Sequence, residues 1–150
     1  MNWTKDKSAK LSLVCIAVFA AILAAVDIGC VWICRWYAGI RFGGNKTYTV
    51  LLALSVYLLS IAAWICLYKL WKLLKNIMAG NVFTDVNVQL LRAVSWCCAA
   101  AAAVSFFSGI YYILFMVPAA AAGFMMLIVR VVKNVFRQAV DMKSELDLTI

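Results

Sequence analysis

Long apolar stretches without charges dominate this chain and decide how it can fold. Thr47–Tyr68 holds 22 residues without a charge and Ala93–Val129 holds 37, while Leu11–Cys34 holds a single charged residue, Asp27. About 20 apolar residues in a helix cross the hydrocarbon core of a bilayer. Hydrophobic residues make up 67% of the chain, more than a soluble protein of this length can bury. The chain is therefore predicted to be an integral membrane protein.

The longest stretch is too long for a single crossing. As one helix, Ala93–Val129 would measure about 55 Å, against a hydrocarbon core of about 30 Å. Two spans with a turn inside 110–118 fit better, because Tyr111 and Tyr112 suit the membrane interface and Pro118 suits the first turn of a helix. We predict an all-α, four-transmembrane-helix bundle that forms one membrane domain, 1–150. Its expected elements are spans at about 11–34, 48–68, 93–111 and 115–133, a loop at 69–92 and a tail at 134–150.

Basic residues are distributed unevenly between the two ends of these spans. Only three, Arg35, Arg41 and Lys46, fall at the predicted outer face. The other eleven fall in the N-terminal segment, the loop and the last segment: Lys5, Lys7, Lys10, Lys69, Lys72, Lys75, Arg92, Arg130, Lys133, Arg137 and Lys143. Because cytoplasmic segments carry the excess of Lys and Arg, both termini are predicted to be cytoplasmic. The first apolar run is too long for a typical secretory signal, so we expect it to be a retained span.

The formal net charge of +8 raises nucleic acid as a partner. Basic residues that orient the chain and contact anionic lipid account for the same charge. We therefore expect contact with the lipid bilayer and no direct binding of nucleic acid.

The segment after the second span has a segregated helical pattern. Lys69, Lys72, Lys75 and Asn76 share one arc of a helical wheel, and the intervening apolar residues share the opposite arc. This pattern predicts an amphipathic helix over 69–79, a stop at Gly80 and a new helix from Thr84 or Asp85. The last span is expected to continue past Arg130 in the same way. Such extensions are either lipid-facing or a platform for a cytoplasmic partner, and both interpretations stay open.

Few residues could carry chemistry. The chain has no His, which excludes His-based catalysis and His metal ligation, and it has neither a phosphate-binding loop nor a Ser-based triad. We expect no enzymatic activity, no catalytic residues, no cofactor and no metal. Asp27 is the only acid inside a span and is a candidate intramembrane functional acid, because a carboxylate in the bilayer is costly. It lies about 24 Å from Leu11 along a helix, so we expect it near the outer interface, paired with Arg35, Arg41 or Lys46 or with water.

Cysteines and small residues give weaker signals. Cys30 and Cys34 lie one helical turn apart, where a disulfide is geometrically marginal, so a redox role for this pair stays open. Small residues recur four apart at Ala21, Ala25 and Gly29, at Ser105 and Gly109, and at Ala119 and Gly123. Such rows allow close helix approach, either within one chain or in a homodimer.

Two segments carry a resemblance to a known family. One is Gly80-Asn81-Val82-Phe83-Thr84 followed by Asn87, Leu90 and Arg92, and the other is Phe136-Arg137-Gln138-Ala139-Val140 with the ending Asp147-Leu148-Thr149-Ile150. The chain resembles the bacterial membrane family called domain of unknown function 2975, although Ser144 and Leu146 depart from its pattern. The resemblance implies a small four-helix protein of the bacterial plasma membrane. Family members are often encoded beside a small helix-turn-helix DNA-binding protein, which implies a regulatory pair.

These observations lead to one functional expectation and two alternatives. We expect a non-enzymatic membrane regulator that tethers, or senses for, a small cytosolic helix-turn-helix protein. A small four-helix transporter of cationic compounds using Asp27 and a structural membrane subunit remain alternatives. An extended tail over 147–150 is expected to add to a partner's sheet edge or fill a groove. The residues expected to contact the partner are Phe83, Thr84, Asn87, Arg92, Asp147, Leu148, Thr149 and Ile150.

Overall fold

Four long helices make up the part of the chain that the computed structural model describes, residues 3–43 and 46–148. They are α1 (Trp3–Phe42), α2 (Lys46–Met78), α3 (Asp85–Gly109) and α4 (Met116–Leu148), with a short 3-10 helix, η1 (Ile113–Phe115), before α4. All four α-helices are long and apolar enough to cross a membrane. The predicted all-α fold with four helices long and apolar enough to span a membrane is confirmed.

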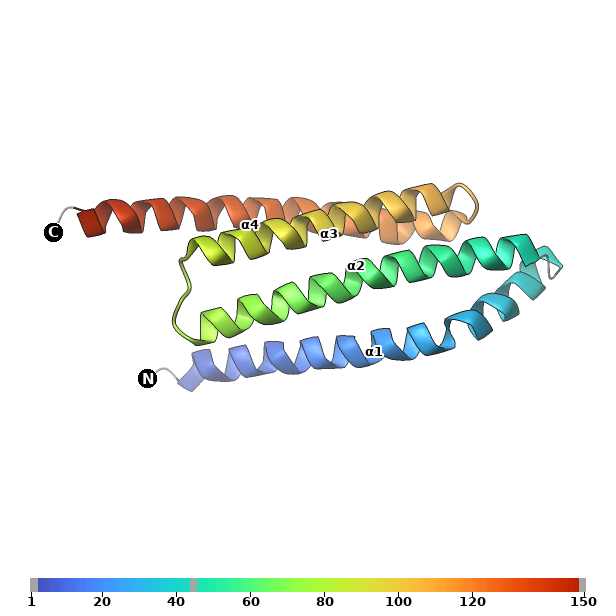
Figure 1. The fold of residues 1–150 in the computed structure, drawn as a ribbon, viewed down its shortest axis with the longest axis horizontal. Helices are drawn as coiled ribbons and strands as arrows, with labels where there is room; N and C mark the ends of the chain where they lie inside the picture. Colours follow the sequence, from blue (N-terminus) through green and yellow to red (C-terminus); the bar gives the residue numbers. More distant parts are fainter. Residues whose placement is uncertain (1–2, 44–45, 149–150) are drawn as a thin grey trace.

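The helices run up and down in an open row (Figure 1). Among the described residues, the backbone of α1 approaches only that of α2, and the backbone of α4 approaches only those of α3 and η1. No contact between α1 and α4 closes the predicted bundle. We call the end with the α2–α3 loop the loop end; α1 starts and α4 finishes there (Figure 1). The opposite end, with the α3–α4 turn, is the hairpin end.

The helices are longer than the apolar stretches that predicted them. Helices α2 and α4 have 33 residues each, which is about 50 Å against a core of about 30 Å. Helix α2 continues from its uncharged span through Lys69 to Met78, as the segregated pattern predicts. Part of each long helix must therefore stand outside the hydrocarbon.

The α2–α3 loop begins and ends where its sequence predicts. Gly80 follows the end of α2 with φ +85°, a left-handed conformation that favours glycine. The Asn81 backbone N–H donates to the Asn76 carbonyl at 3.1 Å and closes the last turn. Helix α3 starts at Asp85 with extended Thr84 at its N-cap. The predicted stop at Gly80 and the predicted restart at Thr84 or Asp85 are confirmed.

The expected extended tail is wrong for Asp147 and Leu148, because α4 stays helical through Leu148. Thr149 and Ile150 lie outside the described residues. Adding a residue to an existing helix gains a hydrogen bond without a new nucleus, and Glu and Leu are good helix formers. Leu146 also continues the apolar stripe of α4 at helical spacing.

The hairpin end is fixed by a small buried cluster. Its buried members are Cys30 and Cys34 from α1, Leu52 from α2 and Tyr112 from the α3–α4 turn. The Tyr112 hydroxyl donates to the Tyr48 carbonyl at 3.0 Å, so this tyrosine is buried between helices, whereas Tyr111 is exposed. The turn lies within the predicted 110–118 segment, and Pro118 falls in the first turn of α4.

Candidate functional site

Asn87 is the centre of a polar network at the loop end. Its side chain is fully buried. Its Nδ2 donates to the carbonyls of Asn81 at 2.6 Å and Val82 at 2.8 Å. Its Oδ1 accepts from Asn76 Nδ2 at 2.9 Å. One side chain of α3 therefore holds both the last turn of α2 and the loop that follows it.

A second contact joins the loop to α4. The Phe83 ring lies 5.6 Å from the Phe136 ring, measured between centroids. Below it, an apolar cluster unites α2, α3 and α4 through Leu73, Leu90, Leu91, Ile77, Val129 and Phe136. Phe83 is nevertheless 45% exposed. The loop end is therefore an ordered surface built from three helices, with an aromatic side chain at its edge.

The structure gathers some of the predicted partner-binding residues and separates others. Phe83 and Thr84 lie in the loop, and Asn87 lies buried beneath it, where it positions the loop. Arg92 is exposed on α3, two turns further toward the hairpin end. The segment 147–148 is about 18 Å beyond Phe136 along α4, so these residues do not join the Phe83 surface.

Asp27 faces α2. Its Oδ2 accepts a hydrogen bond of 2.9 Å from Trp64 Nε1, and the Ser60 hydroxyl is a second hydrogen-bond partner of the carboxylate. The Tyr57 hydroxyl donates to the Asp27 carbonyl at 3.4 Å. The other carboxylate oxygen, Oδ1, is buried and has no hydrogen-bond partner among the described residues.

This arrangement corrects the expected partners of Asp27. Counted along α2, Ser60 lies about 21 Å from Lys46 at the hairpin end. The position of Asp27 relative to the outer interface stays a prediction. Neither Arg35 nor Lys46 forms an ion pair with Asp27 in the described part of the chain, and the side chain of Arg41 lies outside that part.

The partners of Asp27 were not identified from the sequence. Tyr57, Ser60 and Trp64 recur at three- and four-residue spacing and so share one face of α2. That stripe of hydrogen-bonding side chains inside an apolar span is the signal that could have located them.

The Cys30 and Cys34 thiols lie 3.8 Å apart inside the hairpin-end cluster. Both are free, as are the other four cysteines. In the described residues no group of three or more His, Cys, Asp or Glu side chains could hold a metal ion.

Comparison with known proteins gives one match. No curated protein and no solved structure matched the chain. The profile of the family described as "Protein of unknown function (DUF2975)" matches residues 41–150. The match covers α2, α3 and α4 and leaves nearly all of α1 outside. Since it spans well over half of the sequence, the chain belongs to the DUF2975 family.

Proposed function

We propose that this chain is a non-enzymatic, multi-pass protein of the bacterial plasma membrane whose loop end holds a small cytosolic helix-turn-helix DNA-binding protein. The observation that carries the proposal is the buried Asn87 network beneath an exposed Phe83. In a surface loop that only connects two spans, the backbone N–H and C=O groups normally form hydrogen bonds with water. A loop fixed by three side-chain hydrogen bonds and packed on a third helix presents a constant shape.

The exposed groups at the loop end suit a protein partner. Aromatic side chains supply much of the binding free energy at interfaces. The Phe83 ring is held in place by its contact with the Phe136 ring. Exposed cations surround the same end, among them Lys72 and Lys75 on α2 and Arg137 on α4. Such charges accelerate encounter with an acidic surface of a partner.

Regulation would follow from coupling between the bilayer and this surface. A ligand or a change in the bilayer can favour one arrangement of the helices. It changes the affinity for the partner only if the two arrangements bind the partner with different affinities. Helix α2 links the two ends directly, since it contributes Leu52 to the hairpin-end cluster and Asn76 to the loop network.

The proposal is tested by capture of a small helix-turn-helix protein, of the kind encoded beside family members, by membranes that contain the full chain. Phe83→Ala should reduce capture more than fivefold, the loss expected when a central interface aromatic contributes about 1 kcal/mol or more. Phe107→Ala is the matched control, because Phe107 is also exposed but lies near the hairpin end of α3. Equal capture by both variants would reject the loop end as the docking surface.

The tail is tested in the same membranes. Deleting residues 147–150 should leave insertion and stability unchanged and weaken capture, although 147–148 lie apart from Phe83 along α4. Undiminished capture by the shortened chain would remove the tail from the proposed interface.

A second function is favoured by the buried, unpartnered Oδ1 of Asp27. An intramembrane carboxylate with a free oxygen can bind a proton or a cation in exchange for one from the other side, as a small four-helix transporter of cationic compounds requires. Proton-driven uptake of a cationic dye into proteoliposomes, abolished by Asp27→Asn, would favour this function over partner docking. Absence of both capture and dye uptake would leave the structural-subunit alternative.

A further inference from the structure

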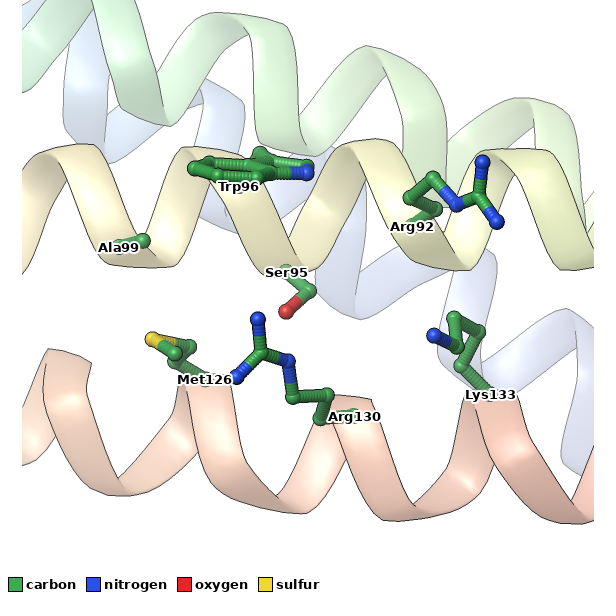
Figure 2. Close-up of a pocket in the computed structure, with 7 residues that line it drawn as sticks. All are labelled: Arg92, Ser95, Trp96, Ala99, Met126, Arg130 and Lys133. Carbon is green, nitrogen blue, oxygen red and sulfur yellow. The ribbon is translucent and has the colours of Figure 1, made fainter.

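Three basic residues line a cavity of about 340 Å³ between α3 and α4. Arg92, Ser95 and Trp96 line it from α3, and Met126, Arg130 and Lys133 line it from α4. Figure 2 shows the Arg130 guanidinium between the two helices, directed toward Ser95, and the Lys133 ammonium further along the seam on the side of Arg92. The α3 residues repeat at helical spacing, as do the α4 residues, so each set lies on one helical face.

None of these three cations is neutralised within the described part of the chain. Arg92, Arg130 and Lys133 form no ion pair or hydrogen bond there. Ser95, at 7% exposed, contributes a hydroxyl group at the base of the cavity. Like charges gathered in a partly enclosed site repel one another and raise the local positive potential. An anion in the cavity would relieve that repulsion.

The depth of the cavity corresponds to the membrane surface. Arg92 lies about 26 Å from Gly109 along α3, and Arg130 lies about 26 Å from Ile113 along α4 and η1. With the hairpin end at one interface of a core of about 30 Å, the cations stand at the other, where lipid phosphates lie. Trp96 lies one turn deeper and is 67% exposed, a position that indoles favour in membranes.

A separate apolar cavity lies further along the same pair of helices, toward the hairpin end. A second cavity of about 480 Å³ follows the same α3–α4 seam, lined by Ala102, Ala103, Ala119 and Ala120 together with larger apolar side chains. Between the two cavities the seam carries Ala99 and Gly123, and a Cβ built at Gly123 meets nothing within 4 Å. The α3–α4 seam thus combines a cavity lined by basic residues, at the depth of the lipid phosphates, with an apolar cavity that an acyl chain could occupy.

From this combination we infer that the α3–α4 seam binds an anionic phospholipid. The guanidinium groups of Arg92 and Arg130 and the Lys133 ammonium hold the phosphate oxygens, and the Ser95 hydroxyl donates to one of them. Trp96 packs beside the glycerol region, and one acyl chain lies in the alanine-lined cavity. Basic pockets between spans at a membrane surface are a recognised form of lipid headgroup site. The inference does not depend on a docked protein partner.

Lipid titration of the purified full chain, read by native mass spectrometry, tests the site. Phosphatidylglycerol should bind at least tenfold more tightly than phosphatidylcholine. The double variant Arg92→Gln/Arg130→Gln should lose at least tenfold in affinity for phosphatidylglycerol. The matched double variant Lys72→Gln/Lys75→Gln removes the same charge from the exposed face of α2 at the same end, and should change that affinity less than threefold.

Several outcomes would overturn the inference. Equal losses in the two double variants would mean general surface attraction, and equal binding of the two lipids would mean no headgroup recognition. Displacement of phosphatidylglycerol by an equal concentration of inorganic phosphate would assign the cavity to a free anion. Loss of partner capture with unchanged lipid binding in Arg92→Gln/Arg130→Gln would assign these cations to the docked protein.

Folding of the variants is controlled separately. Helical content by circular dichroism should be the same in all variants. If the Gln double variant fails to fold, Arg92→Lys/Arg130→Lys keeps both charges while losing the bidentate guanidinium geometry. It should then show a partial loss of phosphatidylglycerol affinity, and full retention would contradict the proposed phosphate contacts.

Discussion

Trp64 on α2 donates a 2.9 Å hydrogen bond from its indole nitrogen to the carboxylate of Asp27 on α1. The contact lies between two long apolar helices, where both groups would be costly without a partner. It also fixes the register between the two helices, because Ser60 one turn away binds the same carboxylate.

The effect on stability of replacing Asp27 is predicted to depend on whether the substitute can still accept a hydrogen bond. Asp27→Asn keeps an oxygen for the Trp64 N–H and removes a charge from the membrane, so insertion should be intact and stability within about 1 kcal/mol of the original. Asp27→Leu leaves the indole N–H unpaired and should cost about 1–3 kcal/mol. Thermal unfolding in detergent measures both. A large loss of stability in Asp27→Asn would mean that the charge itself holds α1 on α2.

The loop end should be sensitive to Asn87. Asn87→Ala removes three hydrogen bonds and leaves the Asn81 and Val82 carbonyls without this partner. The expected loss is about 1–3 kcal/mol, concentrated in the loop, because buried polar groups left unpaired are costly. Limited proteolysis should then cut within 79–84 faster than in the parent chain. Asn134→Ala, at an exposed position on α4, is the control and should leave the cleavage rate unchanged.

Two glycines should respond to alanine with opposite signs. Gly80 has φ +85°, so Gly80→Ala should cost about 1–2 kcal/mol from the left-handed conformation alone. Gly39 lies inside helix α1 with nothing within 4 Å of a built Cβ, so Gly39→Ala should gain about 0.4–1 kcal/mol. Midpoints of thermal unfolding should move down and up, respectively. Stabilisation by both substitutions would mean that the Gly80 turn is not formed in the protein.

Topology is predicted from the distribution of basic residues. Eleven lie in segments at the loop end and three in segments near the hairpin end, so the loop end should face the cytoplasm. Reporter fusions at Asn45 and after Ile150 distinguish the two faces. The fusion at Asn45 should report the outer side and the C-terminal fusion the cytoplasm. An external signal after Ile150 would reverse the orientation or remove one span.

The spans, the Gly80 stop and the α3 start at Asp85 could be predicted because each is set by local chemistry. Uncharged length predicts a crossing, glycine suits a left-handed residue, and Thr84 is a common N-cap residue. Hydropathy does not determine which helices are neighbours, so the open row and the partners of Asp27 could not be predicted. The expected pairing of Asp27 with a basic residue was wrong because Trp64 and Ser60 on the neighbouring helix bind its carboxylate.

The cationic seam shows another limit of sequence reasoning. The sequence predicts Arg92 as one of eight partner-contact residues, and it predicts Arg130 and Lys133 as basic residues that orient the chain and contact anionic lipid. Each assignment follows from one helix at a time. Only the packing of α3 on α4 brings the three side chains to one cavity with Ser95 and Trp96.

The open row also sets an order of assembly. Each helix packs chiefly on the helix made just before it, so the surface that a newly inserted span needs is already in the bilayer when it arrives. No helix has to wait for a distant one, and contacts between chain neighbours form quickly and with little loss of chain entropy. The α1–α2 pair can therefore be complete while α3 and α4 are still being synthesised, and a truncated chain that ends after α2 should still insert as a paired hairpin.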